Sequence, residues 1–195
     1  YKSSPVVELD YAEIEELISS NKKISHVYIV HNETTTGILN DLEIIGSIIK
    51  NTGIEFIVDA MSSLGAIPID MDDYNISYLC ASSNKNIQGM AGVSFVLLKK
   101  ESLRKVKNIK PKSYYLDLYS QHDYFISNYQ MRFTPPVQTI YALKEALIEL
   151  KEEGVNKRYE RYCKSWETLV FGLEEIGFEI LVKKESHSKI IISVV

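Results

Sequence analysis

The feature that most constrains the fold of this chain is a regular alternation between two kinds of segment. In one kind, short apolar runs rich in β-branched residues predict strands at residues 27–30, 55–58, 78–81 and 93–98. In the other, apolar residues recur at helical spacing and predict helices at residues 11–19 and 42–49. Uninterrupted apolar strands separated by helices are typical of an α/β fold with a mostly parallel sheet flanked by helices on both faces.

The second half of the chain has a different, mainly helical pattern. Residues 99–112 are rich in lysine and arginine, and we expect a solvated connector there with no functional role. Helices are expected in part of 114–129 and over 137–152 and 157–176, and strands over 178–182 and 189–195. Prolines before the helix at 137 and Gly154 after it are typical helix boundaries. The last strands predict the start of a smaller α+β domain, with the domain boundary between residues 135 and 136.

Composition excludes several classes of protein. The apolar fraction of 45% and the charged fraction of 25% are those of a globular protein in water. A net charge of −4 gives no reason to expect nucleic acid or a membrane surface as a partner. The two cysteines, Cys80 and Cys163, form no disulfide framework, which fits a reducing compartment. With no apolar run of membrane-spanning length and no signal peptide, we expect a cytoplasmic protein, and we predict no metal site.

Two residues carry the chemistry that the sequence suggests. Asp59 ends one predicted strand, and Lys85 follows the next strand in a small polar turn. Open α/β sheets bind ligands at the carboxyl ends of their strands. An amine there can form a Schiff base with an aldehyde, and a carboxylate can keep a ring nitrogen protonated, so pyridoxal phosphate suits both groups. The alternative is that Lys85 is a solvated surface charge and Asp59 a turn residue.

Further blocks of sequence resemble a known family. They are His31 to Gly37, Val58 to Gly65, Ser83 to Gly89, Lys112 to Tyr119 and Arg132 to Pro136. In order and spacing they resemble the class V aminotransferases of fold type I, which depend on pyridoxal phosphate. Within this family the 2-aminoethylphosphonate–pyruvate transaminases are the most similar subfamily. The resemblance implies that residues 1–135 are part of the large cofactor-binding domain and that residues 136–195 begin the small C-terminal domain, both incomplete.

The resemblance assigns roles to Lys85 and Asp59. Lys85 looks like the lysine that holds the cofactor aldehyde and later carries a proton at the substrate carbon. Asp59 looks like the partner of the pyridine nitrogen, whose protonation its negative charge favours. The implied reaction transfers the amino group of 2-aminoethylphosphonate to pyruvate and gives phosphonoacetaldehyde and L-alanine.

Four other residues match cofactor-binding positions of the family. Thr34 and Asn84 resemble residues near the phosphate or ring oxygen, and Met61 resembles a residue packed on the ring face. Thr134 resembles a threonine that reaches the phosphate bound by the neighbouring subunit, which implies a homodimer with its active site at the interface. Each has a structural alternative: Thr34 could cap a turn, Met61 could fill the core, and Thr134 could cap the helix that follows it.

Some residues are left without a role or depart from the family pattern. His31 is a candidate member of a proton network, although we expect a structural histidine there. Arg132 could bind an anionic substrate or pair with a nearby acid. Asn32 and Asn86 stand where we expect cysteine, Met90 and Ala91 replace Val-Pro, and Lys112 stands where arginine is common. Because lysine and arginine are not interchangeable at a bidentate anion site, these departures leave the exact substrate open.

The ends of the sequence suggest a part of a longer protein, because it begins at Tyr1 and stops within a predicted strand at Val195. We expect the glycine-rich phosphate loop and the ring-stacking aromatic residue upstream, and the arginine that binds the substrate carboxylate downstream. The segment alone is then not expected to catalyse a reaction. The alternatives are a serine– or alanine–glyoxylate aminotransferase, a cysteine desulfurase, and a non-catalytic homologue or fragment of the fold.

Overall fold

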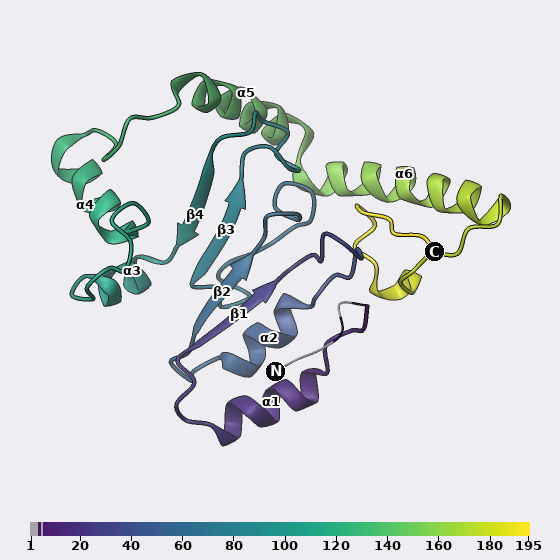
Figure 1. Ribbon diagram of the computed structural model, residues 1–195, viewed down its shortest axis with the longest axis horizontal. Coiled ribbons are helices and arrows are strands. Elements are labelled where there is room, and N and C mark those ends of the chain that lie inside the picture. Colours follow the sequence, from purple (N-terminus) through teal and green to yellow (C-terminus); the bar gives the residue numbers. More distant parts are fainter. Residues whose placement is uncertain (1–3, 5) are drawn as a thin grey trace.

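The computed structural model describes residue 4 and residues 6–195 as a sheet with helices around it (Figure 1). The first part holds α1 (Tyr11–Ser20), β1 (His26–Val30), α2 (Leu42–Ile49), β2 (Glu55–Asp59), β3 (Tyr78–Ser82) and β4 (Ser94–Leu98). The second part holds α3 (Lys100–Val106), α4 (Leu118–Asn128), α5 (Val137–Glu153), α6 (Val155–Glu175) and a 3-10 turn at Lys184–Ser186. The helices and strands predicted before residue 99 are therefore confirmed to within two residues.

The sheet has the strand order β1-β2-β3-β4. The first three strands run parallel, and β4 returns antiparallel to β3. Val30 pairs with Asp59, so β1 and β2 end at the same level, and β3 continues two residues beyond Cys80, which pairs with Asp59. The predicted mostly parallel α/β sheet is confirmed. This arrangement puts the loops after β1, β2 and β3 at one edge of the sheet.

Helices α1 and α2 cover one face of the sheet and form the core with it (Figure 1). Asp10 and Asp41 begin these helices, and each carboxylate accepts a hydrogen bond of 3.0 Å from a backbone N–H in the first turn. The core comprises Ile18, Ile29, Leu42, Ile45, Ile49, Phe56, Val58, Ala60, Ile76, Leu79 and Ala81. These side chains of the helices and strands pack together out of water. Because this packing holds the strands in place, it also fixes where the strands end.

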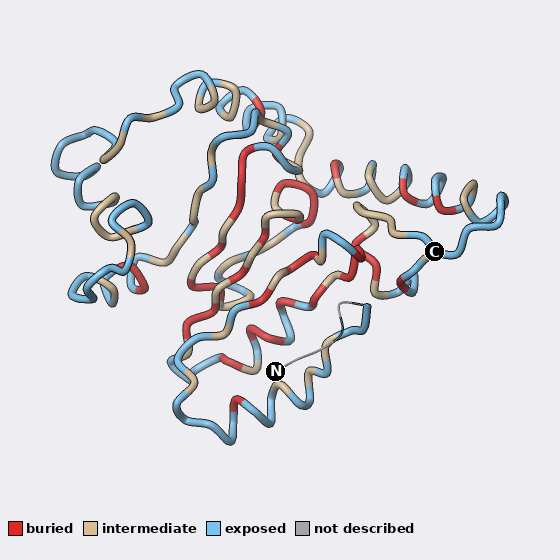
Figure 2. The backbone as a smooth tube through the Cα atoms, viewed as in Figure 1, coloured by how far each residue is buried: buried red, intermediate tan, exposed pale blue. Residues whose placement is uncertain are grey.

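The opposite face of the sheet is covered less completely (Figure 2). Ile57, Tyr78 and Val96 face a hollow of about 470 Å³, and the other wall of the hollow comes from residues 106–119. Helix α4 has no buried residue. The segment from α3 to α4 therefore flanks this face without filling the space between it and the strands.

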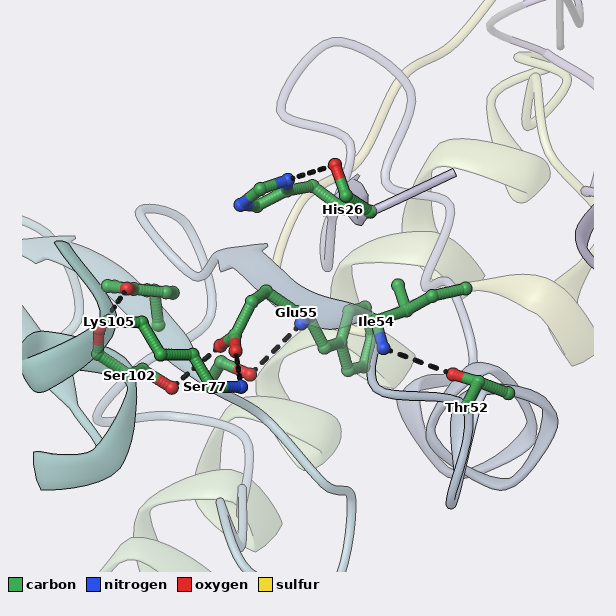
Figure 3. A network of polar contacts seen from close by, with 10 residues as sticks. His26, Thr52, Ile54, Glu55, Ser77, Ser102 and Lys105 are labelled. Atoms are coloured by element: carbon green, nitrogen blue, oxygen red, sulfur yellow. Dashed lines mark hydrogen bonds and ion pairs between the residues drawn. The ribbon is translucent and has the colours of Figure 1, made fainter. Parts of the chain in front are cut away.

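The basic stretch 99–112 is not merely a solvated connector, as the sequence analysis expected. It contains α3, whose Ser102 and Leu103 are buried against the sheet. Ser102 Oγ donates a 2.6 Å hydrogen bond to Glu55 Oε2, and Lys105 Nζ binds Glu55 Oε1 (Figure 3). The charge pattern suggested solvation because it could not reveal that Glu55, a buried acid 50 residues away, binds one of these lysines.

The strands predicted at 178–182 and 189–195 are wrong. The two segments do meet, through a single antiparallel bridge between Ile180 and Val194 and two backbone hydrogen bonds of 2.9 Å, from Leu181 to Ser193 and from Val195 to Glu179. Between them lies the 3-10 turn. An isolated pair of short strands is marginal at best, so the apolar residues at 178–195 form extended structure without a regular ladder.

Over the described part of the chain, no helix combines the length and apolar character required to cross a bilayer. The same residues contain no group of three or more histidine, cysteine or acidic side chains arranged to hold a metal ion.

Candidate functional site

Three polar loops meet at the edge of the sheet where the parallel strands end. They are residues 31–37 after β1, 60–65 after β2 and 83–92 after β3, and together we call this region the carboxyl edge. The three clusters singled out from the sequence are thus brought together by the parallel topology. Ligands of open α/β sheets bind at such an edge.

Ser62 connects the three loops to one another. Its backbone carbonyl accepts hydrogen bonds from Asn32 Nδ2 at 3.1 Å and from Asn86 Nδ2 at 2.9 Å. Its hydroxyl lies 2.5 Å from the hydroxyl of Thr34. The two asparagines that depart from the family pattern therefore act on the same acceptor. They hold the lysine-bearing loop and the first loop against the middle one.

Asp59 is held in place through both of its carboxylate oxygens. Oδ1 accepts from the Met61 backbone N–H at 2.9 Å, and Oδ2 accepts from the Tyr28 hydroxyl at 3.1 Å. Partial burial and the neighbouring carboxylate raise the pKa of Tyr28 to about 12, so at neutral pH this phenol remains a donor. Each oxygen still has a lone pair free, so an oriented carboxylate remains able to accept another proton donor.

The Lys85 side chain is exposed, whereas the loop that carries it is held by hydrogen bonds. The fully buried Ser83 donates through Oγ to the Met90 carbonyl at 2.5 Å and lies 3.2 Å from the Val93 carbonyl. Gly89 N–H donates to the Ser83 carbonyl at 2.7 Å, and a Cβ at Gly89 would lie only 2.9 Å from that oxygen. The loop therefore closes tightly around Ser83, whereas the lysine side chain is left accessible.

His31 belongs to the packed part of the same edge. It is 5% exposed, and its Nδ1 lies 2.9 Å from Ser63 Oγ. Burial lowers the pKa of His31 to about 4, so the ring is neutral at physiological pH. These contacts agree with the structural role expected for this histidine.

Thr34 and Met61 lie with Asp59 and Lys85 at the carboxyl edge, and the exposed Asn84 directly precedes the lysine. Thr134 is exposed in the segment between α4 and α5. It does not cap α5, because Pro136 occupies the cap position and no side-chain cap bond is made.

Arg132 lies beside an acid, which is one of the two roles expected for it. Its guanidinium lies 3.8 Å from Asp117 Oδ2 and 4.5 Å from the centre of the Tyr114 ring. Hydrogen bonds from Ser120, together with this arginine, hold the pKa of the Asp117 carboxyl below its usual value. Arg132 thus pairs with an acid in the described structure.

The residues at the carboxyl edge fit pyridoxal phosphate. An accessible amine and an oriented carboxylate extend from neighbouring parallel strands, which is the donor set that an aromatic aldehyde with a basic ring nitrogen requires. In addition, Asn32 Oδ1 and Ser82 Oγ are buried at these strand ends without a hydrogen-bond partner among the described residues. Such atoms are rare in folded proteins, and a ligand or water at this edge would give them a partner.

Sequence reasoning missed the residues that hold this site in place. Tyr28 could have been found, because β1 pairs with β2 and puts Tyr28 opposite Ile57, two residues before Asp59 on the same face. Ser62 lies within a recognised block of sequence. Its backbone carbonyl accepts the hydrogen bonds from Asn32 and Asn86, and a backbone carbonyl leaves no pattern in a sequence. Arg158, buried in α6 and bonded to the Asn86 carbonyl, is 72 residues away and gave no local signal.

Comparison with known proteins agrees with this geometry. The profile of the family described as "Aminotransferase class-V" matches residues 2–195. A bifunctional phosphonoacetaldehyde hydrolase/aminoethylphosphonate transaminase of Clostridioides difficile is 44% identical over 98% of this chain and 30% of its own length. A 2-aminoethylphosphonate–pyruvate transaminase of Vibrio vulnificus is 44% identical over 93% of this chain and 50% of its own length.

A solved structure shares the fold closely. It is an alanine–glyoxylate aminotransferase from Nostoc sp., which superposes with a TM-score of 0.89 at 27% identity, over 97% of this chain and 50% of that one. The chain therefore spans about half the length of the transaminases that it matches, and less of the bifunctional relative.

Proposed function

The chain belongs to the class V aminotransferase family, and from this we propose that the whole protein transfers the amino group of 2-aminoethylphosphonate to pyruvate. The products are phosphonoacetaldehyde and L-alanine. One observation of the structure carries the reaction type: Asp59 and Lys85 follow neighbouring parallel strands at one edge of the sheet. The names and 44% identity of the two relatives support the choice of amino donor.

The cofactor of this family is pyridoxal phosphate, which when bound supplies an aldehyde for amines and a ring that takes up an electron pair. In our proposal Asp59 holds the ring nitrogen, with its own carboxylate kept in place by Tyr28 and the Met61 N–H. Thr34 and Asn84 bind on the phosphate side, and Met61 packs on the ring face. All of these except Tyr28 are also the positions that resemble cofactor-binding residues of the family.

Lys85 performs the proton transfer in this proposal. In the loaded enzyme this amine would hold the cofactor through its aldehyde. Lys85 Nζ then removes a proton from the amine-bearing carbon of 2-aminoethylphosphonate, and in the return half-reaction it delivers a proton to carbon 2 of the pyruvate skeleton. An exposed side chain on a closed, hydrogen-bonded loop suits this task, because the amine can move while the backbone that carries it stays in place.

We further propose that the whole protein is a homodimer in which Thr134 completes the site of the neighbouring subunit. Thr134 is exposed, and it makes no hydrogen bond to the carboxyl edge of its own chain among the described residues. Helix α4, just before it, exposes Phe125 and Ile126, and Tyr129 at its end is 88% exposed. Apolar exposure of this extent is typical of a surface that another subunit covers.

Hybrid dimers test the arrangement. We expect Lys85→Ala to be inactive and Thr134→Val to be impaired, whereas mixed dimers of the two variants contain one site with both native residues. Mixing should therefore restore activity above the sum of the separate preparations. Failure of mixing to restore activity, in subunits shown to exchange, contradicts the shared site.

The remaining parts of the proposal concern organisation and compartment. We propose that residues 1–135 belong to the large domain and 136–195 to the small domain, because α5 and α6 lie beyond the ends of the strands and not on a face of the sheet (Figure 1). The free thiols of Cys80 and Cys163 support a cytoplasmic location.

A second candidate is an alanine–glyoxylate type of aminotransferase, favoured by the 27% identity with the Nostoc protein. The full-length protein separates the candidates in a coupled assay that offers 2-aminoethylphosphonate, serine or alanine as donor, with pyruvate or glyoxylate as acceptor. We expect the phosphonate and pyruvate to give the highest kcat/KM. A preference for serine or alanine with glyoxylate would overturn the substrate assignment.

The cofactor is tested on the same protein. Full-length wild type should show an absorbance band near the visible edge that borohydride bleaches, and Lys85→Ala should lack it. A wild-type protein loaded with pyridoxal phosphate that shows no such band contradicts the role of Lys85.

A further inference from the structure

A buried cation from α6 contacts the loop that carries Lys85. Arg158 is 2% exposed, and its Nη1 donates a 2.8 Å hydrogen bond to the backbone carbonyl of Asn86, the residue after the lysine. The Asn86 side chain donates in the opposite direction, to the Ser62 carbonyl at 2.9 Å. Asn86 is thus held between α6 and the loop after β2.

The guanidinium is itself fixed by an acid at the end of α5. Arg158 Nε lies 2.5 Å from Glu153 Oε2, and Arg161 Nε lies 2.7 Å from Glu153 Oε1. Hydrogen bonds from the two arginines lower the pKa of Glu153 to about 2, so the carboxylate stays ionised throughout the neutral range. Arg158 therefore keeps both its charge partner and its orientation.

A second contact reaches the same loop one turn further along α6. Gln88 Nε2 donates a 2.6 Å hydrogen bond to the Tyr162 hydroxyl. Gln88 has a positive φ of 67°, which is uncommon for a residue other than glycine, and its backbone N–H closes onto the Lys85 carbonyl at 2.9 Å. Helix α6 thus contacts the loop at residues 86 and 88. Both follow Lys85, and residue 88 closes the turn onto the Lys85 carbonyl.

Stability alone is a weak reason for this arrangement. A buried ion pair often contributes no more than well-packed apolar residues of similar volume, because desolvation offsets the attraction. A guanidinium that also binds a backbone carbonyl provides something that apolar packing does not, namely a fixed position for the peptide next to Lys85. A shift of about 1 Å in a reacting group can cost about 100-fold in rate.

We propose that Arg158 is a positioning residue for Lys85, acting through the Asn86 carbonyl, and that Tyr162 assists it through Gln88. Helix α6, which we assign to the small domain, thereby sets the position of the lysine on the large domain. The consequence for catalysis rests on the proposed function, because it requires Lys85 to be the reacting amine. The consequence for the loop does not.

The test compares Arg158→Met with Arg161→Met in the full-length protein. Arg161 binds the same carboxylate and lies over the Tyr162 ring, but it makes no hydrogen bond with the lysine loop among the described residues, so it controls for the loss of one arginine from Glu153. Hydrogen exchange at the Gln88 and Gly89 amides reports the loop directly. We expect exchange at least about tenfold faster in Arg158→Met, which corresponds to the loss of one hydrogen bond, and a change of less than about twofold in Arg161→Met, which keeps the hydrogen bond to the Asn86 carbonyl.

Kinetics supply the second measurement. We expect kcat to fall about 10- to 100-fold in Arg158→Met with KM for pyruvate nearly unchanged, because the binding groups are untouched. Arg161→Met should keep wild-type kcat. If Arg158→Met does not fold, Tyr162→Phe takes its place, since it removes one hydroxyl and is expected to speed exchange at Gln88 by a few-fold.

The outcomes separate this inference from the proposed function. Wild-type exchange and wild-type kcat in Arg158→Met, or wild-type exchange in Tyr162→Phe where that variant is the one tested, would overturn the positioning role. A wild-type protein without the borohydride-sensitive band would overturn the proposed function. In that case the exchange comparison still decides whether Arg158 holds the loop.

Discussion

The two ends of the central sheet are both polar, but they use their polar side chains in opposite ways. At the amino end of β2, Glu55 is buried and its carboxylate is bound by Ser102 Oγ and Lys105 Nζ, with Ser77 also in contact (Figure 3). At the carboxyl edge, Lys85 Nζ has no hydrogen bond or ion pair with any residue that the structure describes.

Two lysines summarise the difference. Lys105 binds an acid inside the protein, which holds α3 to the sheet. Lys85 lies on a loop closed by backbone hydrogen bonds from Gln88 and Gly89, and its amine has no partner among the described residues. A polar group with all its partners inside the protein can stabilise the fold but has no capacity left for a ligand. A fixed group with unused capacity is the one that can do chemistry.

Among substitutions that leave Lys85 in place, the largest expected effect comes from Asp59→Asn at the carboxyl edge. An asparagine can still accept from the Met61 N–H, and its amide can donate to the Tyr28 hydroxyl, so the local fold should persist. What is lost is the negative charge opposite the ring nitrogen. We expect kcat to fall at least about 100-fold, as when other preorganised electrostatic groups are removed.

Thermal unfolding of the same variant provides the control, with a Tm close to that of wild type. If Asp59→Asn retained wild-type kcat, the carboxylate at this edge would be structural and the contrast with Glu55 would disappear.

The buried ring of His31 should make the free energy of unfolding depend on pH. Its pKa is about 4 in the folded protein, below the ordinary value of 6.5, so the unfolded chain binds a proton first as pH falls. The stability that neutral His31 provides is therefore complete above pH 6.5 and is lost between pH 6.5 and 4. Each unit in that window costs at most about 1.4 kcal/mol, or about 3 kcal/mol in all.

Urea unfolding at several pH values measures this effect as the difference between wild type and His31→Gln. The difference in slope isolates His31 from His187, whose pKa burial also lowers. Parallel pH profiles for the two proteins would contradict the assignment.

The sequence predicted what depends on local pattern. Strand and helix positions before residue 99 follow from apolar spacing, and the parallel order of the strands is enough to bring Asp59 and Lys85 to one edge. The partners that orient these residues are distant in sequence: Tyr28 is 31 residues from Asp59, and Arg158 is 72 from Asn86. Such contacts are chosen by tertiary packing, which a single sequence does not display.

The predicted strands after residue 177 failed for a related reason. Apolar composition indicated strand, but a strand needs hydrogen-bonding neighbours along its length, and the described chain offers Ile180 and Val194 only one bridge. Composition alone could not show whether those neighbours are present.

Glu55→Ala should lower stability without affecting catalysis. The substitution leaves the buried Ser102 hydroxyl without its acceptor and releases Lys105 to water, and we expect a loss of about 2 kcal/mol in the free energy of unfolding. Activity per folded molecule should stay at the wild-type value because the carboxyl edge lies at the other end of the strands.

The pH dependence of the same variant gives an independent check. Although burial opposes ionisation, hydrogen bonds from Lys105, Ser102 and Ser77 give Glu55 a net pKa below its ordinary 4.5. The contribution is therefore complete above pH 4.5 and lost as pH falls further, so wild type and Glu55→Ala should converge in acid. A fall in kcat at neutral pH would instead couple the two ends of the sheet.

The smallest effect is expected from Lys105→Met in the same network. The lysine side chain is 61% exposed, so its attraction to Glu55 is screened by water, and exposed ion pairs contribute about 0–1 kcal/mol. Methionine keeps the apolar stem, and Glu55 retains Ser102 and Ser77. We expect a loss below about 1 kcal/mol in urea unfolding that shrinks further as salt is added, because salt screens this pair in the wild type. If Lys105→Met cost as much as Glu55→Ala, the carboxylate would depend on the ammonium rather than on the hydroxyls. The amino end of the sheet would then be held mainly by the charge of Lys105. The two lysines would differ only in that Lys105 has an acidic partner in the described structure and Lys85 has none.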